Sequence, residues 1–119
     1  MKIAVTTSGL NLAAPLDSRF GRAARFLVYD TDSKDFTIID NNQNLNAAQG
    51  AGIQAAQYVA ATGANAVISG HCGPKAFRVL QAAGIAVYNC EAATVKDAID
   101  LLEAEKIQPA SDADVEGHW

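Results

Sequence analysis

A glycine-rich segment between a predicted strand and a predicted helix groups several side chains that could hold an inorganic ligand. Residues 69–75 read Ser-Gly-His-Cys-Gly-Pro-Lys. Glycines let the backbone turn tightly and approach a ligand, and free N–H groups at a helix start favour an anion. The segment therefore predicts an anion-binding turn, although an ordinary strand-to-helix turn would have the same spacing. Its candidate binding residues are Ser69, Gly70, His71, Cys72, Gly73 and Lys75.

His71 and Cys72 add an imidazole and a thiol to this turn, two ligands that suit zinc, copper or an iron–sulfur centre. We treat both as candidate metal ligands. Adjacent residues rarely bind one metal well, and a closed zinc site would need Cys90 and His71 to meet in space. Otherwise Cys90 is expected to be a small buried hydrophobic residue. Cys72 alone could also serve a thiol redox enzyme, but the sequence has no Cys-x-x-Cys pair.

A second candidate segment is rich in arginine. Residues 17–25 read Asp-Ser-Arg-Phe-Gly-Arg-Ala-Ala-Arg, which places three guanidinium groups close together. The planar, permanently charged guanidinium group can make two hydrogen bonds to a multivalent anion. Each arginine alone could equally lie on a solvated loop. Together with Lys75 and Arg78, however, these arginines hold most of the positive charge of an acidic protein.

The sequence lacks the signatures of several enzyme classes. It has neither the Gly-x-x-x-x-Gly-Lys-Ser/Thr loop of nucleotide hydrolases nor the Gly-x-Gly-x-x-Gly dinucleotide fingerprint. Two-metal hydrolysis needs clustered carboxylates, and the first predicted strand, Lys2–Thr7, contains none. We therefore expect neither nucleotide chemistry of these two kinds nor two-metal hydrolysis.

Composition narrows the possible partners. The 119 residues carry nine Lys plus Arg against thirteen Asp plus Glu, a formal net charge of -4. This balance argues against general binding of nucleic acid or of an anionic membrane. Polar side chains interrupt the first residues too soon for a signal peptide, and no apolar run approaches the ~20 residues of a membrane span. We expect a cytoplasmic protein whose cysteines are reduced.

Hydrophobic periodicity predicts the elements that must position these segments. Strands are expected at Lys2–Thr7, Arg25–Asp30, 35–40, 65–69 and 85–88, and helices at 48–61, 74–83 and 95–106. A short turn joins the second and third strands into an antiparallel hairpin, whereas the strand–helix–strand crossovers require parallel neighbours. We therefore expect an α/β three-layer sandwich with a mixed five-stranded sheet and three helices. Ligands in such sheets gather beyond the carboxyl ends of the parallel strands.

Six segments spread over residues 1–106 resemble one known protein family. They are Lys-Ile-Ala-Val-Thr from residue 2, Ser-Arg-Phe-Gly-Arg-Ala from residue 18, Gln-Gly-Ala-Gly from residue 49, Gly-Ala-Asn-Ala-Val-Ile-Ser-Gly from residue 63, Gly-Pro-Lys-Ala-Phe from residue 73 and Ala-Gly-Ile-Ala-Val-Tyr from residue 83. In this order they resemble the dinitrogenase iron-molybdenum cofactor biosynthesis family. The resemblance implies a ribonuclease H-like fold in a protein that carries anionic metal–sulfide clusters or their precursors and is not an enzyme.

The resemblance also implies which residues face the cargo. The family's Phe-Gly-Arg box falls on Arg19, Phe20, Gly21 and Arg22, and its cofactor-side loop falls on Gly70, His71, Cys72, Gly73 and Lys75. A cluster whose metals are already bridged by sulfides needs charge, N–H donors and a fitted cavity more than it needs new ligands.

From this resemblance we expect a single domain over residues 1–106 that binds a molybdenum–copper–sulfide cluster non-covalently. The composition of residues 107–119, with Pro, Gly, Ser and no periodic pattern, predicts a flexible acidic tail. An iron–molybdenum cofactor precursor is the alternative cargo. A second hypothesis is a regulatory module that docks on a P-loop ATPase through the same turn. The chain is expected to be a monomer without nucleic acid or membrane partners.

Overall fold

Five strands form one mixed sheet in the computed structural model, which describes residues 1–41 and 51–110. The strands are β1 (Lys2–Thr7), β2 (Arg25–Asp30), β3 (Phe36–Asp40), β4 (Ala66–Ser69) and β5 (Ala86–Asn89). Their order across the sheet is β3-β2-β1-β4-β5. The β1–β2 and β2–β3 pairs are antiparallel, and the β1–β4 and β4–β5 pairs are parallel. The predicted hairpin and mixed sheet are confirmed.

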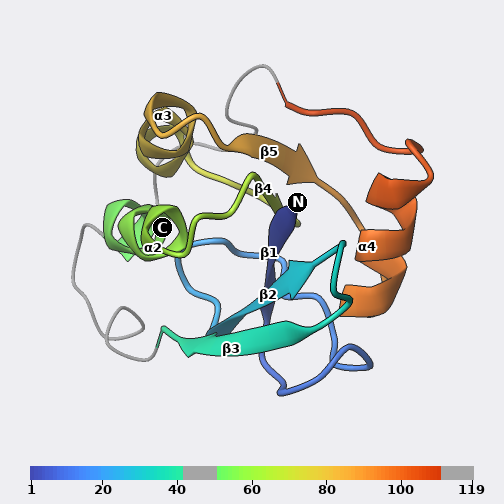
Figure 1. The fold of residues 1–119 in the computed structure, drawn as a ribbon. Helices are drawn as coiled ribbons and strands as arrows, with labels where there is room; N and C mark the ends of the chain where they lie inside the picture. The colour runs from blue at the N-terminus through green and yellow to red at the C-terminus, as the bar shows by residue number, and fades with distance from the viewer. Residues whose placement is uncertain (42–50, 111–119) are drawn as a thin grey trace.

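Three helices in the described residues cover the two faces of this sheet. They are α2 (Ala51–Ala61), α3 (Pro74–Ala82) and α4 (Val95–Glu103). Helices α2 and α3 lie on one face and α4 lies on the other, so the molecule has the three layers that were predicted (Figure 1). The ribonuclease H-like label stays a prediction. None of the described helices has the length and apolar character that crossing a bilayer requires.

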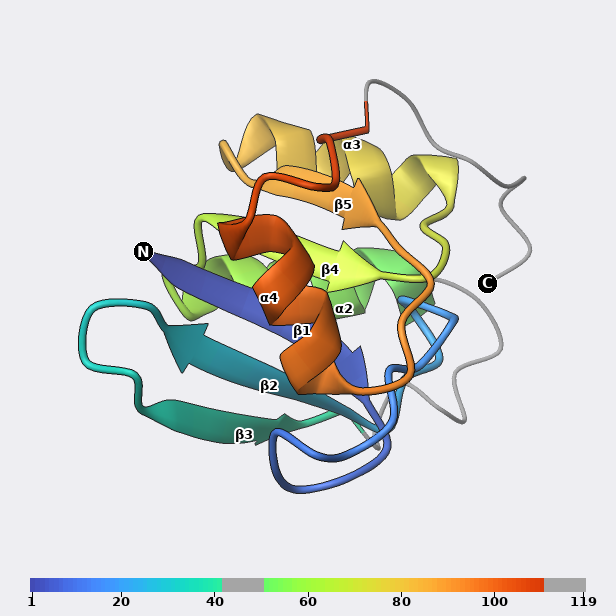
Figure 2. The ribbon, with the colours of Figure 1, turned by 90° about the vertical axis from the view of Figure 1, so that its right-hand side faces the viewer.

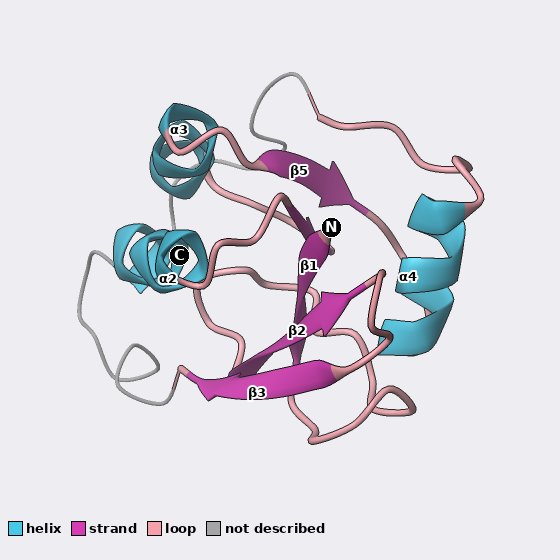
Figure 3. Cartoon of the chain, in the orientation of Figure 1, coloured by secondary structure: helices cyan, strands magenta, loops and turns pink. Residues whose placement is uncertain are grey.

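The central strand β1 has a hydrophobic core on each side, because successive side chains of a strand point to opposite faces. Ala4 packs in the core beneath α2 and α3. Ile3 and Val5 pack in the core beneath α4. All three side chains are fully buried, which makes β1 the strand around which both layers are organised. The elements are distinguished by type in Figure 3.

Local sequence signals predict helix α4 correctly but not the residue at which it ends. Its apolar stripe is buried, and the Thr94 hydroxyl accepts a hydrogen bond from the Asp97 amide at 3.1 Å, as an N-cap does. The prediction extended the helix to residue 106, but it ends at Glu103. Glu105 takes a left-handed conformation with φ 57°, which stops the helix.

Residues 107–110, which the sequence placed in the tail, lie against the body of the domain. Ile107 packs on the core beneath α4, and Ala110 packs on the other core. The Ala110 amide donates a hydrogen bond to the Val87 carbonyl oxygen at 2.7 Å, so this segment covers part of β5. The remaining part of the predicted tail, residues 111–119, lies outside the described residues, as do residues 42–50.

Candidate functional site

The candidate site lies at the edge of the sheet where the three parallel strands end. β1, β4 and β5 point toward the same edge, and the loop between β1 and β2 crosses it (Figure 2). This is the position predicted for a ligand in an open α/β sheet. The loop is fixed to the strand end because the Thr6 hydroxyl donates to the Asp17 carbonyl oxygen at 2.8 Å and the Asp17 amide donates to the Thr6 carbonyl oxygen at 2.9 Å.

One backbone contact joins the two segments singled out in the sequence. The Phe20 amide donates a hydrogen bond to the His71 carbonyl oxygen at 3.1 Å, and Arg19 and His71 form a parallel β-bridge. The arginine-rich segment therefore runs beside the glycine-rich turn. The structure brings the two predicted motifs together at one edge of the sheet.

Gly70 makes this junction possible by lacking a side chain. A Cβ added at Gly70 would lie 2.7 Å from the Ser18 Cα and 2.8 Å from the Ser18 carbonyl oxygen. Real Cβ atoms do not approach other heavy atoms so closely. The sequence suggested that this glycine allows a close approach of the backbone to a ligand, but here it allows a close approach of two segments of the chain.

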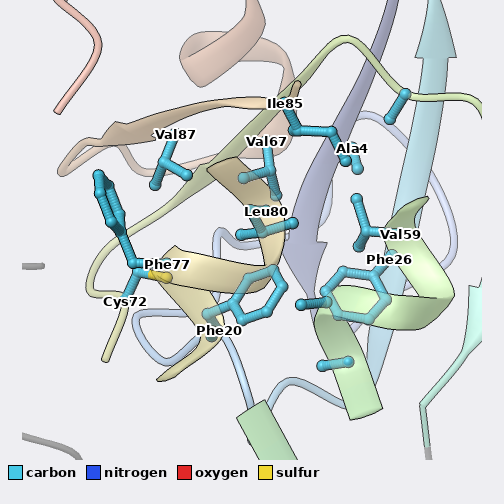
Figure 4. Packing of buried hydrophobic residues seen from close by; sticks show 14 of the residues in the cluster. Ala4, Phe20, Phe26, Val59, Val67, Cys72, Phe77, Leu80, Ile85 and Val87 are labelled. Atoms are coloured by element: carbon cyan, nitrogen blue, oxygen red, sulfur yellow. The ribbon is translucent and has the colours of Figure 1, made fainter. Parts of the chain in front are cut away.

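Phe20 and Cys72 are both inside the core beneath α2 and α3. Phe20 is 1% exposed, and its ring lies 5.5 Å from the ring of Phe26 at an interplanar angle of 43°. Cys72 is fully buried, and Figure 4 shows its sulfur beside Phe77 on the side facing Phe20. In this conformation the Cys72 thiol is enclosed by hydrophobic side chains.

Gly21 and its neighbours fix the start of α2 against the arginine-rich segment. A Cβ at Gly21 would lie 3.0 Å from the Gly52 amide nitrogen and Cα. The Asn41 side-chain amide also donates to the Ala23 carbonyl oxygen at 2.8 Å. These contacts hold Arg22, which is partly buried, near the first turn of α2.

The remaining cations of the site differ in how they are held. Arg19 and Lys75 are exposed, so both side chains can reach a ligand in solvent. Arg25 instead donates to the Ser8 carbonyl oxygen at 2.7 Å and fastens the loop after β1. Of the predicted cationic binding residues, Arg19 and Lys75 are thus exposed and Arg22 is partly buried.

The start of α3 is open to an anion. Gly73 occupies the N-cap position and Pro74 the first helical position, and no side chain of the described residues caps this end. The first turn also has no acidic side chain. Free N–H groups and the positive end of the helix dipole favour a negative charge at such a place.

The start of α4, by contrast, is used inside the protein. The Val95 amide donates to the Ala14 carbonyl oxygen and the Lys96 amide donates to the Leu12 carbonyl oxygen, both at 2.9 Å. Together with the Thr94 cap, these bonds satisfy the orphan amides of this helix. Of α3 and α4, α3 is therefore the helix whose start is available to a ligand.

A small hollow of about 150 Å³ lies between the glycine-rich turn and the residues that follow β5. Its lining residues are Leu16, Ser18, Gly70, His71, Cys90, Glu91 and Ala92. Burial raises the pKa of the Cys90 thiol, and the negative charge of Glu91 raises it further. Cys90 is therefore a neutral thiol at neutral pH.

The two predicted metal ligands have different surroundings. His71 lines the hollow, whereas Cys72 lies in the core. No group of three or more His, Cys, Asp or Glu residues within the described ranges is arranged to hold a metal ion. Metal binding by His71 and Cys72 stays a prediction.

From the sequence, Cys90 was expected to be mainly a buried hydrophobic residue, and Glu91 was not considered as part of the site. Cys90 is buried, as expected of a small hydrophobic residue, but it also shares the hollow with His71. The available signal was its place directly after β5, since residues that follow adjacent parallel strands meet at one edge.

Comparison with known proteins identifies the class to which this fold and site belong. A family model described as dinitrogenase iron-molybdenum cofactor matches residues 1–105. The chain belongs to this family, as the sequence motifs indicated.

Individual relatives agree with this assignment. The structure is similar to the apo form of the orange protein from Desulfovibrio gigas, with 40% identity, a TM-score of 0.93 and 96% of each chain covered. It is also similar to a Thermotoga protein provisionally described as NifB, with 31% identity, a TM-score of 0.84 and 98% of each chain covered. An uncharacterized protein of Methanocaldococcus jannaschii is 30% identical over 107 residues, which cover 83% of this chain and 90% of the relative.

Proposed function

We propose that this protein carries an anionic, molybdenum-containing metal–sulfide cluster and catalyses no reaction on it. Membership in the dinitrogenase iron-molybdenum cofactor family supports a role in binding such a cluster or in its biosynthesis. A molybdenum–copper–sulfide cluster is our first choice of cargo, and an iron–molybdenum cofactor precursor is the alternative. We expect this carrier to work in the cytoplasm, where its cysteines stay reduced.

The observation that carries the proposal is the backbone junction between Phe20 and His71. It places the arginine-rich segment beside the turn that leads into the uncapped start of α3. Arg19 and Arg22 then contribute positive charge from one segment, and Lys75 contributes it from the other. A single anion at this edge would meet cations from both segments.

Charge and N–H donors suit a cargo whose metals are already bridged by sulfide. Sulfide ligands on the outside of such a cluster carry negative charge and accept hydrogen bonds. Guanidinium groups and the free amides of α3 are donors of the matching kind. Binding of this type holds the cluster without breaking its metal–sulfur bonds, which leaves it intact for transfer to an acceptor.

Reconstitution tests the proposal directly. The apo protein is mixed with tetrathiomolybdate and a copper salt, passed over a size-exclusion column and examined by visible spectroscopy and metal analysis. We expect intense visible absorbance that elutes with the protein, with molybdenum and copper in fixed proportion. A colourless eluate from protein that is folded by circular dichroism would contradict the proposal for this cargo. The same column run with an iron–molybdenum cofactor precursor tests the alternative.

A further inference from the structure

Strand β3 forms one of the two outer edges of the sheet, and the two edges differ in how they are covered. At the other edge, residues 107–110 cover part of β5, where the Ala110 amide donates to the Val87 carbonyl oxygen at 2.7 Å. Within the described residues β3 pairs only with β2, so no other strand lies along its far side (Figure 2). An open strand edge is a template on which another strand can pair.

The hydrogen bonds between β2 and β3 show which backbone groups of β3 point outward. Just beyond the strand, the Asn41 amide donates to the Ala24 carbonyl oxygen at 2.9 Å. Residues of an antiparallel strand bond to one neighbour at every second position, so residues 39 and 37 also bond toward β2. The amide and carbonyl groups of Phe36 and Ile38 therefore point away from the sheet.

The side chains of β3 leave apolar surface at this edge. Phe36 is 36% exposed. Ile38 packs partly on the core beneath α4, and Ile39 packs partly on the core beneath α2 and α3. A groove of about 360 Å³, whose lining includes Thr37 and Ile39, lies beside the strand. A second strand at this edge would therefore have both hydrogen-bond partners and room for its side chains.

We propose that a second copy of this chain occupies the edge, with its own β3 antiparallel to this one and the two-fold axis at Thr37. Phe36 of each copy then lies opposite Ile38 of the other. Each of these two pairs exchanges two backbone hydrogen bonds, because all the groups concerned point outward. The two sheets become one continuous sheet across the axis.

Side-chain pairs favour this register over its neighbours. It sets Phe36 beside an isoleucine and Thr37 beside its own copy, and aromatic–β-branched and Thr–Thr pairs are favourable across strands. It also sets Lys34 opposite Asp40, two exposed residues of opposite charge. With the axis at Ile38, Phe36 would lie opposite Asp40 instead. With the axis at Asp40, two carboxylates would oppose each other.

This interface does not depend on the cargo. Strand β2 separates β3 from the parallel strands whose ends form the candidate site. The dimer and the cluster carrier can therefore fail independently. In place of the monomer expected from the sequence, the edge of β3 predicts an equilibrium between monomer and dimer.

Sedimentation of the full-length protein between about 10 µM and 1 mM tests the dimer. We expect a reversible dimer that grows with concentration, and a weak one, because two short strands bury little surface. T37K sets two ammonium groups at the axis and should raise the dissociation constant at least about 10-fold, since like charges directly opposite repel. T37V is the matched control and should dimerise like the wild type. Thr37 is exposed, so both variants should keep the wild-type circular dichroism.

A charge exchange tests the register. K34D and D40K each place like charges opposite each other and should weaken the dimer. The double variant K34D/D40K restores opposite charges and should recover much of the wild-type affinity. In amide NMR spectra of the wild type, the signals of Phe36 and Ile38 should shift as the concentration rises.

Three results would overturn the β3 dimer. They are a wild type that stays monomeric at the highest concentration, a T37K variant that dimerises as tightly as the wild type, and a dimer that leaves the amide signals of Phe36 and Ile38 unchanged. The last result would place the contact on another surface. If a charge variant fails to fold, the NMR titration of the wild type decides.

Discussion

Phe20 donates its amide hydrogen to the carbonyl oxygen of His71 across 3.1 Å. On either side of this bond, the side chains of the two motifs alternate between an inner group that packs in the core and an outer group that faces away from it. Phe20 and Cys72 point into the core, and the bridge partners Arg19 and His71 point away from it. The outer group is on the side where a ligand is predicted, while the inner group packs in the core beneath α2 and α3.

Replacing Gly70 with alanine should destabilise the junction between the motifs. The new Cβ would lie 2.7 Å from the Ser18 Cα, and backbone must shift to admit it. We expect G70A to lower the free energy of unfolding by about 1–3 kcal/mol, the usual cost of overpacking. Denaturant unfolding followed by circular dichroism measures this change. Gly70 does not have the positive φ of Gly63 and Gly84, so steric overlap is the cause that is tested.

The control for this prediction is S18A. The clash involves Ser18 backbone atoms, and the Ser18 side chain is exposed. S18A should therefore change stability by no more than about 0.5 kcal/mol. Equal stability of G70A and the wild type would show that the two segments can move apart at little cost.

Truncating Phe20 tests whether the first residue of the Phe-Gly-Arg box serves the core or the cargo. The resemblance placed Phe20 among the cofactor-binding residues, but its side chain is 1% exposed and packs against Phe26. F20A should cost about 3–5 kcal/mol of unfolding free energy because it leaves a large cavity. F20L keeps more of the buried volume and should cost less. A stable F20A that fails to bind cluster would instead give Phe20 a direct role toward the cargo.

Removing positive charge should weaken cluster binding without unfolding the protein. Arg19 and Lys75 are exposed, and exposed charge pairs are worth about 0.2–1 kcal/mol each. The double variant R19Q/K75Q should therefore raise the dissociation constant of the reconstituted cluster several-fold. The effect should shrink as salt is added, because salt screens exposed charges. Optical titration over a range of ionic strength measures both effects.

K106Q is the matched control for the charge variants. Lys106 is exposed and follows the C-terminal end of α4, whereas the candidate site lies near the start of that helix. K106Q should leave the cluster affinity close to that of the wild type. If K106Q weakens binding as much per charge as R19Q/K75Q does, net charge explains the affinity and the proposed site does not.

Strands and helix α4 could be predicted from the sequence because the patterns of apolar residues that define them are local. Apolar β-rich runs identified β1 and β2 at the bounds that the structure shows, and the spacing of apolar residues identified α4. The end of α4 was missed because a glutamate, Glu105, adopts a left-handed conformation that is more typical of glycine.

The site was only partly predictable because its contacts join distant parts of the chain. The two motifs were recognisable from glycine, arginine and histidine in short segments. The fit of Gly70 against Ser18 and the shared hollow of His71 and Cys90 depend on how loops cross the end of the sheet. No periodic pattern of apolar residues in the sequence predicts these contacts.

Cys90 should react slowly with alkylating agents, and Glu91 should be part of the reason. Burial and the Glu91 charge raise the pKa of the Cys90 thiol above its ordinary value, so the reactive thiolate is scarce at neutral pH. In a C72S background, iodoacetamide labelling followed by mass spectrometry should be slower than labelling of a free cysteine at neutral pH. The rate should keep rising with pH beyond the range in which an ordinary thiol is fully ionised. E91Q removes the smaller of the two causes that raise the Cys90 pKa, namely the Glu91 charge. The pKa of the thiol should therefore fall, and labelling at the same pH should be faster. Burial still protects the sulfur. An unchanged or slower rate in E91Q would show that the carboxylate does not act on this thiol.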